Sequence, residues 1–286
     1  MSNLGVSMPP NVDNAKRAAR NAATSRWMTG LARLGYACKG MVYVIIGFLA
    51  GQVALGNAAQ APDNTSAIQT LYDQPFGKLL LALVTIGLFG FALWSLIQAI
   101  FDTEGKGKKI GGIIARIGYV GVAVSYGALA FAALNLVMGS GTGGKSSNTT
   151  AQDWTASFLN QPFGVALVML AGLIALGVAC ALFYKAFKAT FRQKLRLATL
   201  RPVVRRGVLF IGRLGQSALG VVASIIGIFL IVAALKHNPG EAKGLSGALV
   251  TLLQQPFGPL LLGIVAVGLL AYGIYSFVEA RYRRLG

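Results

Sequence analysis

The sequence predicts an all-α membrane protein in which six transmembrane helices form three parallel two-helix repeats around a pseudo-threefold axis. Three observations predict this fold: six long apolar runs, a four-residue signature that occurs three times, and basic residues concentrated in alternate connections. Hydrophobic residues make up 55% of the 286 positions and charged residues only 12%, about half the charged fraction of a soluble domain. This composition excludes a soluble globular protein.

The apolar runs are each long enough to cross a hydrocarbon layer about 30 Å thick, which takes about 20 helical residues. In lipid they must be helices, because every backbone polar group needs a partner within its own segment. The predicted spans are residues 34–56, 76–101, 114–138, 163–188, 210–235 and 257–280. The first run is too long for a cleavable signal peptide, so it is predicted to be an uncleaved anchor behind a basic lead.

The spans alternate between two sequence patterns. The odd-numbered spans open with Leu31-Ala32-Arg33-Leu34-Gly35-Tyr36, Ile114-Ala115-Arg116-Ile117-Gly118-Tyr119 and Ile211-Gly212-Arg213-Leu214-Gly215-Gln216. The even-numbered spans follow Gln74-Pro75-Phe76-Gly77, Gln161-Pro162-Phe163-Gly164 and Gln255-Pro256-Phe257-Gly258. The spacing from Arg to Gln is 41, 45 and 42 positions, so the chain is a tandem repeat of one unit.

The chain therefore divides into a basic N-terminal segment (1–30), two repeats (31–105 and 106–192), a basic linker (193–209) and a third repeat (210–286). The signature is predicted to start each even helix, because proline is tolerated in a first helical turn. Short interfacial helices are expected just before it, at residues 66–73, 155–160 and 246–254.

The orientation follows from the positions of Lys and Arg. Twenty-two of them lie at the chain ends and in the second and fourth connections, whereas only four lie on the other side: Lys78, Lys145, Lys236 and Lys243. The positive-inside rule predicts that both termini are cytoplasmic. Each repeat holds two spans, so all three repeats share one orientation, unlike the inverted repeats of many transporters.

These motifs resemble those of the DUF1206 family of bacterial membrane proteins. The resemblance rests on the three Arg-x-Gly openings, the three Gln-Pro-Phe-Gly signatures and the C-terminal end from Tyr275 to Arg284, and it covers residues 30–284. It implies a multi-pass protein of the bacterial inner membrane. It implies no activity, cofactor or catalytic residue.

The residues themselves indicate no reaction. The central thirds of the predicted spans contain no carboxylate, His or Lys, which disfavours proton-coupled transport. His237 is the only histidine, so a haem held by two histidines is excluded. There is no phosphate-binding loop and no Ser-His-Asp set, and no cofactor, metal site or catalytic residue is predicted.

The best candidate site is a rim at the cytoplasmic ends of the helices. Its equivalent arginines are Arg33, Arg116 and Arg213, and their equivalent polar partners on the even helices are Gln98, Lys185 and Glu279. Glu279 is expected to pair with Arg213 or with Lys185. Threefold packing would let the arginines converge on an anion or a lipid phosphate. The alternative is that each arginine only anchors a helix end at the membrane interface.

The leading functional hypothesis is a non-enzymatic structural or accessory protein that binds anionic phospholipid or a partner membrane complex. Apolar spans and the many basic residues of the cytoplasmic side support it. Nucleic acid is a poor alternative partner, since no binding motif is present. Two other functions stay open: a channel or facilitator for a small solute along the axis, and an enzyme acting on lipid headgroups at the arginine rim.

Overall fold

The computed structural model describes residues 26–58, 60–101, 110–139, 144–190, 195 and 201–283. Six of the described helices are long and apolar enough to cross a membrane, which confirms a multi-pass membrane protein. They are α2 (Arg26–Ala54), α4 (Gly77–Phe101), α5 (Ile110–Val137), α7 (Gly164–Lys188), α8 (Pro202–Leu235) and α10 (Gly258–Tyr282). Most of the basic N-terminal segment and residues 193–194 and 196–200 of the basic linker lie outside the described residues.

Short helices join the two spans of each repeat. They are α3 (Asn64–Tyr72), α6 (Ser147–Leu159) and α9 (Leu245–Leu253), with a 3-10 turn, η3 (Pro239–Glu241), before the last one. The sequence predicted all three, but α6 begins two turns earlier than expected because Ser146 caps it through the Thr149 N–H. We call the side of the molecule that carries these helices the short-helix face.

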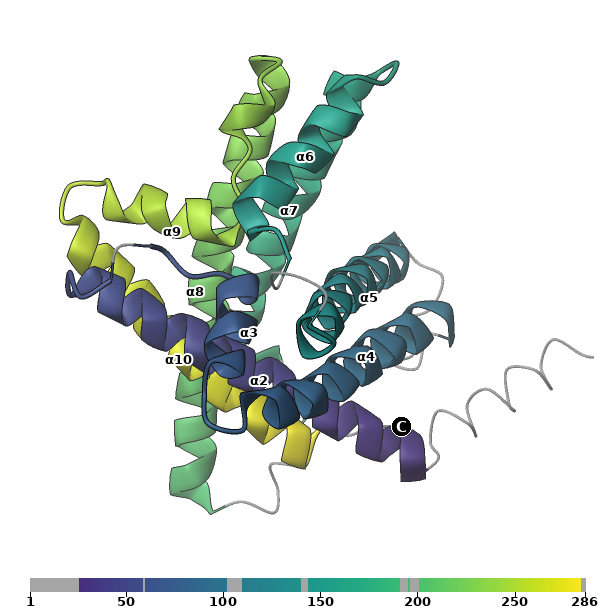
Figure 1. Ribbon diagram of the computed structural model, residues 1–286, viewed down its shortest axis with the longest axis vertical. Helices are drawn as coiled ribbons and strands as arrows, with labels where there is room; N and C mark the ends of the chain where they lie inside the picture. Colours follow the sequence, from purple (N-terminus) through teal and green to yellow (C-terminus); the bar gives the residue numbers. More distant parts are fainter. Residues whose placement is uncertain are drawn as a thin grey trace, which may run out of the picture.

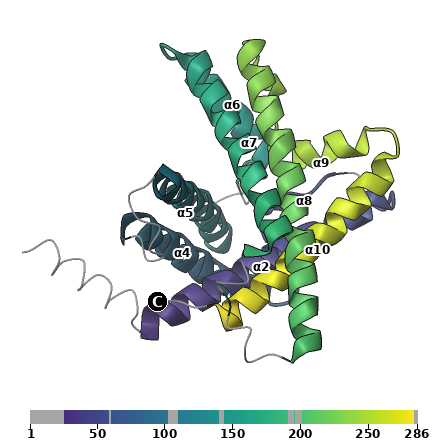
Figure 2. The ribbon, with the colours of Figure 1, turned by 180° about the vertical axis from the view of Figure 1, so that it is seen from behind.

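The six long helices form three antiparallel pairs: α4 with α5, α7 with α8, and α10 with α2 (Figures 1 and 2). Each pair joins the even helix of one repeat to the odd helix of the next, and the last repeat closes onto the first. This cyclic order confirms the pseudo-threefold arrangement. Repeats that share one orientation and each pack against the next repeat in the sequence give such a cyclic arrangement.

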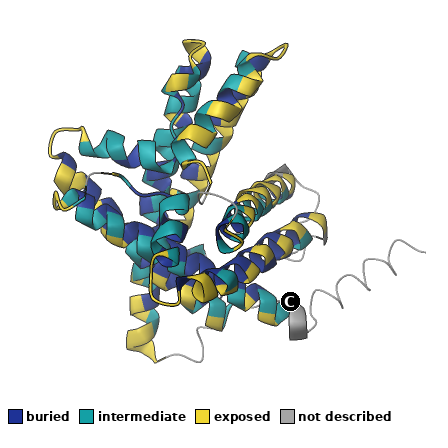
Figure 3. Cartoon of the chain, viewed as in Figure 1, coloured by how far each residue is buried: buried dark blue, intermediate teal, exposed yellow. Residues whose placement is uncertain are grey.

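The repeats differ in how their own two helices pack. Helices α2 and α4 of the first repeat pack together, as do α8 and α10 of the third, whereas α5 and α7 have almost no contact. The main core therefore surrounds α2 and α10, with Ile46, Leu262 and Leu269 fully buried. The faces of α5 and α7 that turn away from their partners are largely exposed (Figure 3).

The Gln-Pro-Phe-Gly signature folds in the same way in all three repeats. The Gln carbonyl accepts a hydrogen bond from the Gly N–H at 2.7–2.9 Å, and the Phe has a positive φ of 60–63°. This is a type II turn, in which proline is favoured at the second position and a left-handed residue at the third. The even helices begin at the glycine.

The prediction that proline lies in the first helical turn is therefore wrong. Proline occupies the second position of the type II turn, and the helix starts two residues after it. The structure also explains the glycine. A methyl group on Gly77 would lie 1.9 Å from the Tyr72 carbonyl oxygen, and Gly164 and Gly258 are equally close to the preceding short helix. Only glycine lets the even helix start against the end of the short helix.

Helix α8 is longer than its predicted span. It starts at Pro202, a favourable first residue for a helix, so residues 202–209 of the predicted basic linker form its first two turns. The exposed residues Val203 and Arg206 of these turns, the N-cap residue Arg201 and the following Phe210 lie on the side opposite the short-helix face, which we call the basic face.

Candidate functional site: a buried charge cluster between α2 and α10

Three ionisable side chains meet between the first and last long helices. The Glu279 carboxylate lies 2.8 Å from Arg283 Nη1 and 3.9 Å from Lys39 Nζ. All three side chains are less than a tenth exposed. Burial of these charges is tolerated because each has a partner of opposite sign. Two cations of the described part of the chain share this one carboxylate.

Aromatic rings enclose the Lys39 ammonium. Its Nζ lies 4.7 Å from the ring centre of Tyr272, 5.3 Å from that of Phe91 and 5.5 Å from that of Tyr36. The Arg283 guanidinium lies over the other side of the Tyr36 ring, at 4.7 Å. The faces of these rings are electron-rich and attract cations, so they stabilise both cations of the cluster.

This cluster was not predicted from the sequence. Lys39 was counted with the basic residues that reach the start of the first predicted span, 34–56, so the conclusion was that the central part of no span contains a lysine. That conclusion is wrong, because α2 begins at Arg26 and Lys39 lies near its middle. The available signal was a single lysine inside a long apolar run, and an intramembrane lysine calls for a partner.

The cluster is unique to one of the three equivalent interfaces. In the repeat alignment Lys39 corresponds to Val122 and Leu219, and Glu279 corresponds to Gln98 and Lys185. Only the interface between the third and first repeats therefore combines a lysine with a carboxylate. This difference marks the one place where the ring of repeats is closed by helices that are far apart in sequence.

The predicted partners of Glu279 were wrong, since Lys39 and Arg283 occupy its carboxylate instead of Arg213 or Lys185. Gln98 is buried and Lys185 is exposed, so the three equivalent rim positions have different surroundings. Arg283 was not distinguished from the rest of the basic C-terminus because its role depends on the i, i+4 spacing to a buried carboxylate.

The predicted arginine rim also has unequal members. Arg116 is half-buried and donates from Nε to the Ala99 carbonyl and from Nη2 to the Ile100 carbonyl, at 2.8 Å for the second bond. It therefore caps the end of α4. Arg33 and Arg213 are exposed on α2 and α8. Convergence of the three arginines on one anion stays a prediction.

Aromatic side chains meet near the pseudo-threefold axis. Tyr43 and Tyr126 occupy equivalent positions in the first and second repeats, and their side chains approach each other closely enough to interact. Equivalent side chains can touch only close to the axis that relates them. Tyr272 packs on Tyr43 and Phe91 packs on Tyr126, both edge to face at 4.8 Å. At this depth bulky rings occupy the axis.

The short-helix face is joined across all three repeats by hydrogen bonds at helix N-termini. One Asp63 oxygen accepts from the Ser66 N–H of its own helix (2.9 Å), and the other accepts from the Ser147 N–H of α6 (2.6 Å). In turn, the Asn148 side chain accepts from the Gly244 N–H at the start of α9. A carboxylate suits this position because helix N-termini carry partial positive charge.

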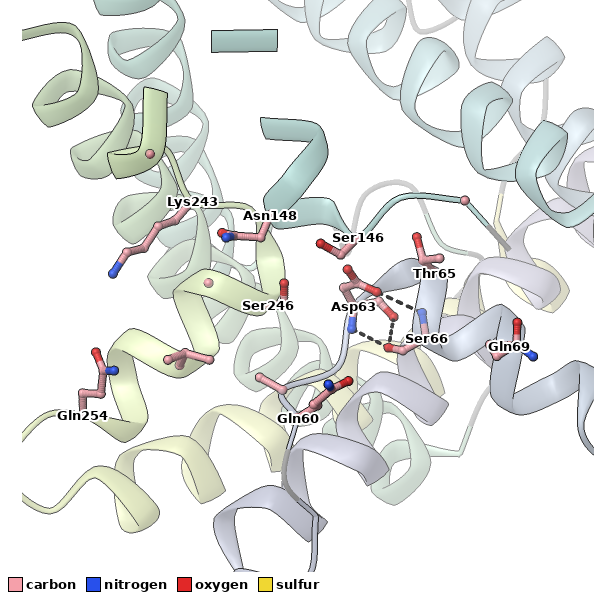
Figure 4. Close-up of a pocket in the computed structure, with 15 residues that line it drawn as sticks. Gln60, Asp63, Thr65, Ser66, Gln69, Ser146, Asn148, Lys243, Ser246 and Gln254 are labelled. Atoms are coloured by element: carbon pink, nitrogen blue, oxygen red, sulfur yellow. Dashed lines mark hydrogen bonds between the residues drawn. The ribbon is translucent and has the colours of Figure 1, made fainter. Parts of the chain in front are cut away.

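A pocket of about 690 Å³ lies at these N-termini (Figure 4). All three repeats line it, with carboxamides or hydroxyls from Gln60, Gln69, Ser146, Asn148 and Gln254. Within the described ranges, His, Cys, Asp and Glu nowhere form a group of three that could hold a metal ion. The pocket and the buried cluster therefore offer hydrogen-bonding groups and charge.

Comparison with known proteins gives a family without an assigned activity. The family described as "Domain of Unknown Function (DUF1206)" matches this chain three times, at residues 34–102, 117–189 and 214–283. Each matched segment contains one pair of long helices. An uncharacterized protein of Bacillus subtilis (strain 168), YxxB, is 38% identical over 262 residues, which cover 92% of this chain and 94% of the relative. No solved structure matches this chain.

Proposed function

The chain belongs to the DUF1206 family, whose description assigns no activity, and we propose from its geometry that it is a non-enzymatic membrane protein that binds anionic phospholipid through its basic face. The observation that carries the proposal is the pairing of exposed cationic and exposed apolar side chains on the same helical turns. This pairing is typical of segments that lie at the boundary between lipid headgroups and acyl chains.

The first two turns of α8 provide the clearest example. Val203 is 80% exposed and Phe210 is 67% exposed, and Arg201 and Arg206 are exposed beside them. The apolar side chains suit the acyl region, and the guanidinium groups reach phosphates at the surface. Each basic side chain near an anionic surface contributes about 1 kcal/mol.

The end of α7 has the same composition. Phe187 is 81% exposed and lies between the exposed residues Lys185 and Lys188. Together with α8, this places cations along the interface between the second and third repeats. In the proposed orientation the basic face is cytoplasmic, where bacterial inner membranes present anionic lipid, and both termini lie on that side.

The test is native mass spectrometry of the protein extracted gently with its own lipids. The variant Arg201→Gln/Arg206→Gln is expected to retain several-fold less phosphatidylglycerol than the wild type. The matched control Lys145→Gln/Lys236→Gln changes two exposed lysines of the short-helix face and is expected to retain as much as the wild type. If the wild type and both variants retain the same amount of phosphatidylglycerol, the proposal is wrong.

A second protein held at fixed stoichiometry in the same spectra would instead favour an accessory subunit of a membrane complex. That result would keep the protein non-enzymatic but would replace lipid with a protein as its main partner.

A solute channel is the second candidate, and the pocket on the short-helix face, which all three repeats line, favours it. Conduction would require Tyr43 and Tyr126 to separate, because their side chains meet near the axis. Liposomes with the wild-type protein are therefore expected to show no flux of small polar solutes. Flux that increases in Tyr43→Ala/Tyr126→Ala would support a gated path, and flux in the wild type would favour the channel.

A further inference from the structure

The phenylalanine of each Gln-Pro-Phe-Gly signature is among the most exposed large apolar residues in the described part of the chain. Phe76 is 84% exposed, Phe163 is 86% exposed and Phe257 is 80% exposed. Each ring therefore makes little contact with the folded chain, although a phenylalanine occupies this position in all three repeats.

The same residue also has an unfavourable backbone conformation. Its φ is 60–63° in every repeat, in the left-handed region where a Cβ atom crowds the backbone. Glycine or asparagine would occupy this position of a type II turn at a lower cost. The phenylalanine is therefore favoured neither by the turn nor by the core, which indicates a contact outside the folded chain.

The three rings lie at one end of the even helices. Each phenylalanine directly precedes the first residue of a membrane-spanning helix, α4, α7 or α10. Two spans separate one signature from the next, so all three signatures lie on the same side of the membrane. The even helices have 25 residues each, about 37 Å at 1.5 Å per residue, whereas the hydrocarbon layer is about 30 Å thick. Their first turns therefore reach the boundary between hydrocarbon and headgroups.

The polarity of the exposed side chains changes within the signature. The glutamine is exposed in each repeat, and Gln74 and Gln255 donate to carbonyls of the preceding short helix at 3.4 and 3.3 Å. Two residues later the exposed side chain is the phenylalanine. Exposed apolar side chains continue from it at helical spacing: Leu79 and Leu83 on α4, Leu167 and Leu170 on α7, and Leu260 and Ile264 on α10. Each ring is therefore the first member of an apolar stripe along a span.

A bilayer is the partner that suits all three rings. Rings related by the pseudo-threefold axis lie on three sides of the molecule, so one protein docked on one side could not contact them all. Lipid surrounds the spans on every side, and interfacial segments use phenylalanine to enter the acyl region.

We propose that Phe76, Phe163 and Phe257 are membrane anchors that fix the depth of the even helices in the leaflet on the short-helix side. A span longer than the hydrocarbon layer can tilt or shift along its axis, and side chains at its end oppose this movement. The inference goes beyond the proposed function, because it concerns the face opposite the basic face and requires no anionic lipid.

Nitroxide labels measure the position of each ring. Cys180 is exposed and is changed to Ala, whereas Cys38 is buried and stays. Single labels in phosphatidylcholine bilayers replace the rings in Phe76→Cys, Phe163→Cys and Phe257→Cys. The matched controls are the exposed C-caps of the short helices, three residues earlier: Asp73→Cys, Asn160→Cys and Gln254→Cys. The ratio of collisions with oxygen to collisions with a water-soluble nickel chelate should be at least three-fold higher at each phenylalanine position than at its control.

Equal ratios at the phenylalanine and control positions would place the rings in water and overturn the proposal. Few collisions with either reagent at the phenylalanine positions would show that protein covers the rings, from a second copy or another partner. That result would also overturn the proposal.

A combined variant, Phe76→Asn/Phe163→Asn/Phe257→Asn, tests whether the rings fix the depth of the helices. Asparagine tolerates the left-handed turn, so the variant is expected to unfold in detergent at no lower temperature than the wild type. A nitroxide at Leu79→Cys, in the first turn of α4, should collide with the nickel chelate at least two-fold more often in this variant, because asparagine draws the helix start toward water.

The control Phe76→Trp/Phe163→Trp/Phe257→Trp should leave the label at Leu79→Cys as it is with phenylalanine, since tryptophan also suits the membrane interface. If this label meets the nickel chelate equally often with phenylalanine and with asparagine at the three positions, the rings do not fix the depth and the proposal is wrong.

Discussion

The three repeats are linked in one way on the short-helix face and in another way in the basic half of the molecule, by which we mean the halves of the long helices nearer the basic face. On the short-helix face, Asp63 links the first repeat to the second and Asn148 links the second to the third, so all three join through hydrogen bonds. In the basic half, the buried cluster joins the third repeat to the first, while α5 and α7 stay apart.

This difference shows in which part of the molecule the three repeats must meet the same physical requirement. Helix N-termini carry backbone N–H groups without intrahelical partners, and leaving them unsatisfied costs free energy in every repeat. On the short-helix face, a side chain of the preceding repeat therefore helps to meet this requirement, Asp63 at the start of α6 and Asn148 at the start of α9. Between long apolar helices the only requirement is that side chains fit, so substitutions such as Ile174 for a glycine let one repeat depart from the others.

The largest expected effect concerns the buried cluster. Glu279→Gln removes the negative charge between Lys39 and Arg283 and leaves two buried cations side by side. The apparent free energy of unfolding in detergent should fall by about 3–5 kcal/mol. The control Glu241→Gln breaks an exposed pair with Lys236 and should cost less than about 1 kcal/mol. Equal falls in the free energy of unfolding of the two variants would show that the buried cluster does not stabilise the contact between α2 and α10.

The next effect separates the closed and open repeats. Gly215→Ala places a methyl group 2.6 Å from the Tyr272 backbone and should cost about 1–3 kcal/mol. Gly118→Ala meets nothing and should gain up to about 1 kcal/mol from helix propensity. Thermal unfolding of both variants in detergent measures the contrast. A comparable loss for Gly118→Ala would mean that α5 and α7 close in solution.

The short-helix face is tested at Asp63. Asp63→Ala removes the cap of α3 and the acceptor of the Ser147 N–H at the start of α6, and should cost about 1–2 kcal/mol. Hydrogen exchange at the Ser66 and Ser147 amides should become faster together, because both donate to this carboxylate. Asp73→Ala, an exposed carboxylate at the other end of α3, serves as the control. Faster exchange at Ser66 alone would mean that the link between repeats does not form.

The smallest effect concerns the signature turn, which follows each short helix. Phe163 has a φ of 63°, a conformation that costs an ordinary residue about 1–2 kcal/mol and that asparagine tolerates better. Phe163→Asn should therefore raise stability in detergent by less than about 1 kcal/mol, and Phe76→Asn and Phe257→Asn should match it. A loss of stability would show that the exposed ring contributes more than the turn costs.

Much of the fold was predictable because it depends on local sequence. Run length and composition located the six spans, and the recurring signature located each even helix to within one or two residues. The turn itself was misassigned, since a Phe in the left-handed region is rare and cannot be recognised from residue preferences. The start of α2 was placed too late, and this error alone hid Lys39.

The site was less predictable. Arg33, Arg116 and Arg213 are equivalent in sequence, yet one caps α4 and two are exposed, because a long flexible side chain takes whichever partner its own interface offers. Glu279 was recognised as a polar rim residue, but its partners were not, since Lys39 comes from the opposite end of the chain.

By itself the sequence determined that this chain crosses a membrane six times as three copies of one unit. These properties depend on hydrophobic length and on spacing along the chain. The tertiary structure alone decided which helices pair, that the second repeat stays open, and that Lys39 meets Glu279. Such choices depend on the sizes and charges of side chains that face each other across an interface, and only packing brings those side chains together.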